Sequence, residues 1–569
     1  MVVMEDGTKF RYNNTFGGFW VYDPEDPFND NAQPNSYTPP LNETWDFGKD
    51  KIYGVNLGGL FVIEPFITPS FFQQYPDAKD EWDLSLAMSN DSANGGLDQL
   101  EKHYDTFITE QDIAEIAGAG LNWLRIPIAF WAIETWEGEP FLAKTSWTYL
   151  LRVLKWARKY GLRVCLDLHA VPGSQNGYNH SGRLSPVNLL NGNMGLANAQ
   201  RTLYYIRVLT EFISQPEYRN LVPIFGIVNE ALVGEIGMDA ITSFYLEAHN
   251  MIREITGYGE GNGPYIAIHD GFQPITVWEN FLAGSDRIIL DQHPYFSFGA
   301  VDESPIDVNG EDGSPGGKWP KQACDAWASG TNTRQGNLPQ KNFGVTISGE
   351  MAASPNDCGL FLRGAGSNST NSQCPYYDDW KSYNDTMKEG IQNFALASFD
   401  ALQNWFFWTW KIGPSAESGE VETPLWSYQL GYRNGWLPSD PRSYVGKCAA
   451  LGSAQQPFDG SYSAWQTGGE TSTIVASSTS RYTWPPASIS GANVDVSLLP
   501  TYTATGSVVT LPPATFTDAP SSVTSSVDGW YNDQDTAAGI TTVSGCPYPD
   551  EYNGIFSTTP TAPCTGPTA

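Results

Sequence analysis

Two glutamates end apolar, strand-like stretches of this sequence, and a pair of carboxylates is what the hydrolysis of a glycosidic bond requires. Glu230 ends the stretch IFGIVNE, and Glu350 ends the stretch GVTISGE. A retaining glycosidase places two such groups about 5–5.5 Å apart, one as the nucleophile and one as the acid and base. The acid must hold a proton near the working pH, so we expect its surroundings to raise its pKa.

Other residues suited to sugar chemistry end the neighbouring stretches. Asn229 directly precedes Glu230 and would hold a sugar hydroxyl. A cation at Arg125, with hydrogen bonds from His293 and Tyr295, would keep a nearby carboxylate ionised. Because several different strand-like stretches end in such residues, we expect these ends to meet in one site.

Each of these residues also has a plainer interpretation. Asp167 and His169 could form a satisfied buried pair, and Trp408 could pack in the core. His293 could bind a metal, but no HxH or HExxH motif accompanies it, and the neighbouring Asp291 is interpreted as structural. The sequence has no GxSxG motif, which argues against a serine hydrolase. We expect neither a metal nor an organic cofactor.

Eight short apolar stretches must position these residues. Amphipathic stretches such as 146–160 and 199–214 lie between them and repeat apolar residues with the helical period. Alternating strands and helices predict a parallel sheet, and eight strands with long loops predict a (β/α)8 TIM barrel. An open doubly wound sheet is the alternative, but no GxGxxG turn follows the first stretch. The predicted strands cover residues 52–59, 122–128, 163–170, 224–230, 265–270, 288–295, 344–350 and 404–411.

Composition changes divide the chain into three parts. Residues 1–50, rich in Pro, Asn and Asp with isolated aromatics, predict an extended N-terminal arm rather than a domain. Residues 51–450 hold the predicted barrel. Residues 451–569 are rich in Ser, Thr and Pro but also carry Trp465, Trp484 and two cysteines, so we expect an ordered C-terminal extension packed on the barrel.

The charge balance excludes several classes of protein. With 31 Lys and Arg against 63 Asp and Glu, the net charge is −32, which argues against a nucleic-acid partner. Aromatic residues make up 13% of the chain, too many for a disordered acidic protein. No apolar run is long enough for a membrane segment, and no signal peptide is visible. We expect a monomer.

Glycosylation motifs and cysteines point to an oxidising compartment. Asn-x-Ser/Thr motifs begin at Asn13, Asn42, Asn90, Asn179, Asn368 and Asn384. Cys165 lies in an apolar stretch and is interpreted as a buried free thiol. The other six cysteines could form three disulfides, with Cys358 and Cys374 as a plausible local bridge. We expect a secreted, cell-surface or cell-wall glycoprotein whose targeting or anchor segment is absent from this sequence.

Seven segments together resemble the fungal exo-β-1,3-glucanases of glycoside hydrolase family 5. The two ends of the chain also look like the larger, membrane-associated branch of these enzymes. The matching segments are GVNLGGLFVIEPFITPSFF (54–72), LNWLRIPIAFWAI (121–133), LDLHAVPGSQNGYNHSG (166–182), GIVNEA (226–231), DQHPYFSF (291–298), ISGEMAAS (347–354) and FFWTWKIG (406–413).

The resemblance implies specific roles. Glu230 would be the acid/base and Glu350 the nucleophile. Glu64 would contact the non-reducing-end sugar, and Tyr178 and Phe298 would clamp the next sugar at the entrance. The remaining residues implied to surround the first sugar are Arg125, His169, Asn229, His293, Tyr295 and Trp408.

Two departures from the family pattern affect the entrance. The family's Gly-Gly-Trp is Gly58-Gly59-Leu60 here, and its Phe-Asp-Asn is Tyr178-Asn179-His180. A glycan on Asn179 would crowd the entrance, so we expect this motif to be unused.

The resemblance implies a retaining exo-β-1,3-glucanase that releases glucose from the non-reducing ends of β-1,3-glucan. Related branches cleave β-1,6-glucan, glycolipid glucosides or rutinosides. Because the entrance is altered, these substrates are alternatives to β-1,3-glucan. An alternative from another class is a glycan-binding wall protein that has lost catalysis.

Overall fold

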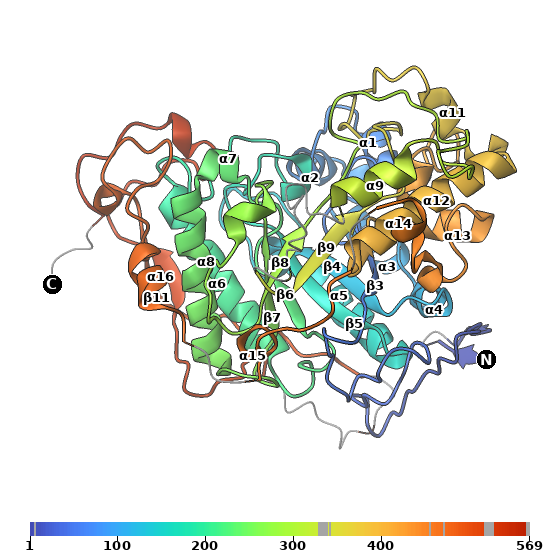
Figure 1. Cartoon of the computed structure of the whole chain (residues 1–569). Coiled ribbons are helices and arrows are strands. Elements are labelled where there is room, and N and C mark those ends of the chain that lie inside the picture. The colour runs from blue at the N-terminus through green and yellow to red at the C-terminus, as the bar shows by residue number, and fades with distance from the viewer. Residues whose placement is uncertain are drawn as a thin grey trace.

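Eight parallel strands close into a barrel, as the sequence predicts, and the open-sheet alternative is wrong (Figure 1). A computed structural model describes residues 1–4, 7–327, 340, 343–453, 457–469, 473–516, 520 and 528–564. Neighbouring strands pair in sequence order, and the last strand pairs with the first. The barrel strands are β3 (Tyr53–Asn56), β4 (Trp123–Ala129), β5 (Arg163–Ala170), β6 (Ile224–Gly226), β7 (Tyr265–His269), β8 (Ile288–Gln292), β9 (Thr346–Met351) and β10 (Trp405–Phe407).

Helices cover the outside of the barrel and begin and end at local sequence signals. At the start of α4 (Glu110–Gly118), the Thr109 and Asp112 side chains each accept a backbone N–H bond, which forms a capping box. At the end of α5 (Thr145–Tyr160), Gly161 adopts a left-handed backbone with φ 77°. The main outer helices are α3 (Asp98–Thr106), α4 (Glu110–Gly118), α5 (Thr145–Tyr160), α6 (Gly195–Ile213), α8 (Met238–Thr256), α9 (Trp319–Trp327), α12 (Asp385–Leu402) and α13 (Tyr428–Asn434).

Several strands are shorter than the apolar stretches that predict them. The stretch 224–230 pairs only as far as Gly226, and the stretch 288–295 only as far as Gln292. Glu230 therefore lies beyond β6, with a positive φ of 48°. Beyond Gly226 the chain no longer pairs with the neighbouring strands, and the Glu230 side chain lines the cavity at the end of the barrel.

The N-terminal arm closes the bottom of the barrel. Trp45 and Phe47 pack with the buried residues that fill this end, including Trp123 at a ring distance of 5.1 Å from Trp45. Arg163 holds the arm, because its guanidinium donates to the carbonyls of Pro39, Pro40 and Glu43, each at 2.8 Å.

The C-terminal extension runs along the outside of the barrel helices (Figure 1). Its two-stranded sheet of β11 (Tyr502–Gly506) and β12 (Gly539–Thr542) packs against α6. Arg201 on α6 is fully buried and forms ion pairs with Glu139 and with Glu551 of the extension. The described parts of the extension are therefore held on the barrel by the packing of their sheet against α6 and by an ion pair with Arg201.

The cysteines divide as the sequence suggests. Cys165 is a buried free thiol inside the barrel. The disulfides are Cys324–Cys448, Cys358–Cys374 and Cys546–Cys564, which settle the connectivity that the sequence left open. Among the described residues, no helix is both long and apolar enough to span a membrane.

Candidate active site

A cavity of about 500 Å³ lies at the carboxyl ends of the barrel strands. Eight of the eleven site residues predicted from the sequence line it. Glu230 and Glu350 both face this space, which brings the two candidate carboxylates together. The other six predicted residues on the wall are Glu64, His169, Tyr178, Tyr295, Phe298 and Trp408.

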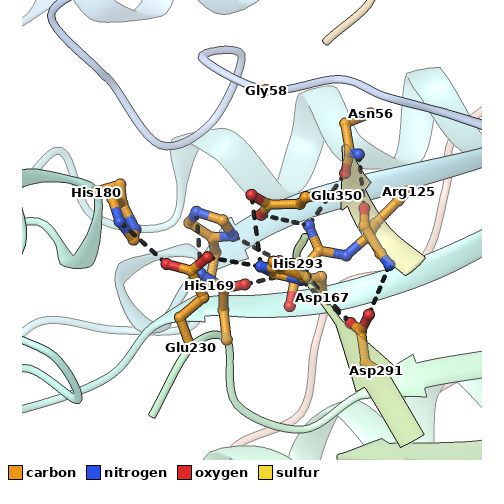
Figure 2. Close-up of polar contacts among 12 residues, drawn as sticks. Asn56, Gly58, Arg125, Asp167, His169, His180, Glu230, Asp291, His293 and Glu350 are labelled. Atoms are coloured by element: carbon orange, nitrogen blue, oxygen red, sulfur yellow. Dashed lines mark hydrogen bonds and ion pairs between the residues drawn. The ribbon is translucent and has the colours of Figure 1, made fainter. Parts of the chain in front are cut away.

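Arg125, Asn229 and His293 are not among the residues that line the cavity. Arg125 and His293 contact the carboxylates of the cavity from behind (Figure 2), and Asn229 bonds to Arg125. Arg125 on β4 donates to Glu350 Oε1 at 3.0 Å and to Asn229 Oδ1 at 2.8 Å. It also pairs with Asp167 Oδ2 at 3.1 Å. Burial acts to lower the pKa of Arg125, but the surrounding carboxylates raise it above its usual value. This fixed cation organises the centre of the site.

Glu350 is held at both oxygens. Besides the bond from Arg125 to Oε1, the Tyr295 hydroxyl donates to Oε2 at 3.0 Å. Burial raises the pKa of Glu350, and the nearby Glu230 adds to this, while His293 and Arg125 oppose it. The bonds from Arg125 and Tyr295 fix the carboxylate in one orientation.

Glu230 is surrounded by imidazoles. His293 Nδ1 lies 2.6 Å from Glu230 Oε1, and His180 Nε2 lies 3.3 Å from Oε2. Burial alone would raise the pKa of Glu230, but these histidines lower it below its ordinary value. Burial likewise acts to lower the pKa of His293, yet the Glu350 and Asp291 carboxylates raise it. The expectation that the surroundings of Glu230 raise its pKa is therefore wrong, because His293 and the neighbouring histidines favour the ionised carboxylate.

The two carboxylates are close. His293 Nδ1 lies 2.6 Å from Glu230 Oε1 and 3.5 Å from Glu350 Oε2. These two oxygens are therefore at most about 6 Å apart, which is compatible with the separation of about 5–5.5 Å between the carboxyl groups of retaining glycosidases.

An aromatic and imidazole wall forms one side of the cavity. The Trp408 ring stacks on the His169 ring at 5.5 Å and an interplanar angle of 6°. His169 is fixed by Asp167, which lies 2.6 Å from its Nδ1. Gly58 makes room for Trp408, because a Cβ atom there would lie 2.7 Å from the indole ring. Asp167 and His169 are thus a satisfied pair, as one interpretation held, and the pair also shapes the cavity.

Glu64 is a buried acid with an unused oxygen. Its Oε1 has no hydrogen-bond partner among the described residues, and the side chain lines the cavity. Burial, together with Glu350 and Glu230, raises the pKa of Glu64 well above its ordinary value. Such a group is ready to exchange hydrogen bonds with hydroxyl groups of a bound sugar.

The entrance carries exposed aromatic rings. Tyr178 is 42% exposed and Phe298 is 53% exposed, far more than the residues deeper in the cavity. Asn179 lines the same entrance and is half-buried, whereas the asparagines of the other five glycosylation motifs are exposed. The expectation that Asn179 carries no glycan stays a prediction.

Several residues of the site were not predicted from the sequence. Asn56 ends β3 and accepts from Arg125 at 3.0 Å, so the rule that strand ends form the site would have found it. His180 was visible only as a departure from the family pattern. Asp291, interpreted as structural, accepts from the Gly349 N–H at 2.6 Å. Loop residues that no strand pattern signals complete the wall: Phe66, Leu184, Phe272, Leu362, Arg363 and Trp426.

One cluster of this site has the residue types of a metal centre. Glu230, His269 and His293 offer ligand atoms within 4.8 Å of one another. The 2.6 Å separation between His293 and Glu230 is that of a hydrogen bond, whereas two ligands of one tetrahedral zinc ion lie about 3.3 Å apart. The arrangement favours proton sharing over metal coordination.

Comparison with known proteins agrees with this geometry. Residues 88–309 match the family model Cellulase (glycosyl hydrolase family 5). The chain is 35% identical over 471 residues to a probable glucan 1,3-beta-glucosidase D of Aspergillus clavatus, covering 77% of this chain and 52% of that protein. It is 34% identical over 464 residues to the protein of the same name from Aspergillus niger, again covering 77% and 52%. The chain thus spans about half the length of the curated relatives it matches.

Solved structures share the fold. The crystal structure of a rutinosidase from Aspergillus niger covers 69% of this chain and 99% of its own, with a TM-score of 0.51 and 17% identity. The crystal structure of AoRut covers the same shares, with a TM-score of 0.53 and 18% identity. At these identities the likeness concerns the fold alone. The family match and the sequence relatives show that residues 88–309, within the barrel, belong to glycosyl hydrolase family 5.

Proposed function

We propose that this protein is a retaining exo-β-1,3-glucanase that releases glucose from the non-reducing ends of β-1,3-glucan. The observation that carries the retaining mechanism is the spacing of the two carboxylates, both of which contact His293. The names of the relatives, probable glucan 1,3-beta-glucosidase D, support the substrate.

In the first step, Glu350 attacks the anomeric carbon of the terminal glucose. The bond from that carbon to the glycosidic oxygen breaks, and the oxygen takes a proton from Glu230. Since His293 shares a proton with Glu230 across 2.6 Å, the pair supplies this proton as the leaving group develops charge. In the second step, Glu230 removes a proton from water, which displaces Glu350 and releases glucose with its β configuration.

The residues behind the wall prepare the nucleophile. Arg125 holds Glu350 Oε1 by a charge-assisted bond, and Tyr295 holds Oε2. When one oxygen of Glu350 bonds to the sugar, the donor on the other oxygen keeps that oxygen in place. Because Glu350 must be ionised to attack, we expect activity to fall as the pH drops through its raised pKa.

The shape of the cavity supports action at chain ends. Glu64 is 4% exposed and offers an oxygen without a partner among the described residues, as expected of a group that binds the terminal sugar. Tyr178 and Phe298 would clamp the next sugar by contact with its apolar faces. A glucan would enter with its non-reducing end first and leave the rest of its chain outside.

The proposal extends to where the protein works. Three disulfides and six glycosylation motifs support a secreted or cell-wall glycoprotein. The net charge of −32 suits a neutral polysaccharide partner better than nucleic acid.

Another β-glucoside remains a second candidate substrate, because the entrance departs from the family pattern at Tyr178-Asn179-His180. A panel of laminarin, pustulan and rutin tests both candidates by the rate and identity of the released sugar. We expect glucose from laminarin to form fastest. Faster hydrolysis of pustulan or rutin would show that β-1,3-glucan is not the preferred substrate. Laminarin binding without glucose release would show that the protein binds glycan but does not hydrolyse it.

A further inference from the structure

His180 occupies a place in the site that neither the strand pattern nor the family resemblance assigns. Its Nε2 lies 3.3 Å from Glu230 Oε2, while His293 holds the opposite oxygen (Figure 2). His180 and Glu230 both line the cavity, whereas His293 lies behind its wall. Oε2 is therefore the oxygen of Glu230 that a glycosidic oxygen would approach, and His180 is the group beside it.

The protonation state of His180 follows from its surroundings. Burial lowers the pKa of His180 to about 4, with Glu230 acting in the opposite direction. His180 Nδ1 is buried and has no hydrogen-bond partner in the described part of the chain. In the neutral ring, the tautomer that carries its proton on Nε2 is the one that can donate to Glu230. Other titratable groups act on these two residues, namely His169, Asp167, His269, His293, Glu350, Asp270 and Glu64.

The loop that carries His180 is fixed on both sides. The Ser181 hydroxyl donates to the Tyr178 carbonyl at 2.8 Å. The Trp82 N–H donates to the Gly182 carbonyl at 2.9 Å, and the Leu184 N–H to Asp80 Oδ2 at 2.6 Å.

The C-terminal extension supports the same loop from outside. The Arg183 guanidinium lies 3.9 Å from the centre of the Trp82 ring and 5.0 Å from that of Tyr552, which belongs to the extension. The Tyr552 carbonyl also accepts from Asn188 at 2.7 Å. The imidazole is thus held against Glu230 by a braced loop.

We propose that His180 is a positioning residue for the acid/base Glu230, an inference that rests on the proposed function. It orients Oε2 toward the leaving group. When Glu230 gives its proton to the departing oxygen, the His180 N–H donates to the carboxylate that remains. His180 thereby stabilises the ionised form of Glu230 that the first step produces and the second step uses as a base.

Two amide variants separate this role from a merely structural one. His180→Gln keeps an N–H close to the position of the imidazole Nε2, whereas His180→Asn is too short to reach Glu230. Both variants preserve the Asn-x-Ser motif at Asn179, so glycosylation is not altered. His249→Gln, a histidine-to-amide change on α8 outside the cavity, is the control.

The experiment compares two substrates over a range of pH. Laminaritriose needs a protonated leaving group, whereas 2,4-dinitrophenyl β-glucoside does not. For His180→Asn, we expect kcat/KM to fall about 10- to 100-fold with laminaritriose and less than about threefold with the aryl glucoside. The first loss is smaller than the roughly 10²- to 10⁴-fold that general acid catalysis supplies, because Glu230 itself is kept. Without the donor, the pKa of Glu230 rises, so the alkaline limb of the laminaritriose profile shifts to higher pH. His180→Gln restores most of the loss.

Four other outcomes would contradict one of the two proposals. Equal losses on both substrates, or an unchanged pH profile in a folded His180→Asn variant, would overturn the role of His180. That role is also overturned if His180→Gln fails like His180→Asn while its melting temperature equals that of the wild type. A wild-type protein that hydrolyses neither substrate would instead overturn the proposed function itself.

Discussion

The deep end and the entrance of the cavity are built in different ways. At the deep end, buried side chains at strand ends bond to one another repeatedly, as Arg125 does with Glu350, Asn229 and Asp167. At the entrance, loops carry Tyr178 and Phe298, each of which is about half exposed. The chemistry therefore depends on the barrel, whereas the choice of substrate depends on loops that can change without disturbing it.

The largest expected effect concerns the nucleophile at the deep end. Glu350→Gln removes the attacking carboxylate but keeps its shape, so we expect kcat on laminarin to fall at least about 10⁴-fold. The melting temperature should change little. Activity within tenfold of the wild type would show that Glu350 is not the nucleophile and that the chemistry does not depend on the deep end as proposed.

A smaller effect on activity, together with a loss of stability, is expected at Arg125. Arg125→Gln leaves buried carboxylates without their cation, so both activity and stability should fall. We expect kcat to drop about 100-fold and the free energy of unfolding by about 3–5 kcal/mol. Urea denaturation and laminarin kinetics measure the two losses. A loss of activity with unchanged stability would mean that the network does not hold the deep end together.

The entrance should respond in a different kinetic parameter. Tyr178→Ala and Phe298→Ala each remove a ring that would contact the second sugar, worth about 0.5–1.5 kcal/mol. We expect KM for laminaritriose to rise about 2- to 12-fold with kcat nearly constant. If kcat falls instead and KM stays the same, the contrast between deep end and entrance does not hold.

The last effect is one of stability rather than of rate, and it concerns Glu81, which bonds to the backbone next to Glu64. Burial raises the pKa of Glu81 to about 8, and its Oε2 accepts from the Ile63 N–H at 2.7 Å. The folded state then keeps a proton that the unfolded state loses above about pH 4.5. Stability is therefore greatest below about pH 4.5 and falls as the pH rises toward 8, by at most about 1.4 kcal/mol per unit.

Glu81→Gln cannot ionise and should flatten this dependence. Urea midpoints at pH 5 and pH 8 test it, because the wild type should lose more stability between the two than the variant. If the wild type and Glu81→Gln lose the same stability between pH 5 and pH 8, the dependence on pH does not come from Glu81.

The deep end could be predicted from the sequence because strand periodicity places its residues. Glu230 and Glu350 end apolar stretches, and closing eight strands brings such ends together, whereas Arg125 lies inside its strand and reaches them with a long side chain. The same logic failed in detail at Glu230, which lies beyond its strand on a turn with positive φ. Its lowered pKa was also missed, because His293 was expected to act on the nucleophile and His180 approaches from a loop that no strand pattern signals.

The entrance could be predicted only where the family resemblance supplied a position. Phe272 and Arg363 reach the wall from loops whose paths depend on tertiary contacts, such as the Cys358–Cys374 bridge beside Arg363. No periodic signal marks such residues. The C-terminal extension was predicted to be ordered, but its brace on the loop of His180 was not visible in its composition.

The configuration of the first sugar released is the most direct test of the retaining mechanism. ¹H NMR during the first minutes of laminaritriose hydrolysis distinguishes β-glucose from α-glucose before the two interconvert. Two carboxylates within about 6 Å predict that β-glucose forms first and that the α signal grows only by mutarotation. If α-glucose forms first, the reaction inverts, and the assignment of Glu350 as nucleophile is contradicted.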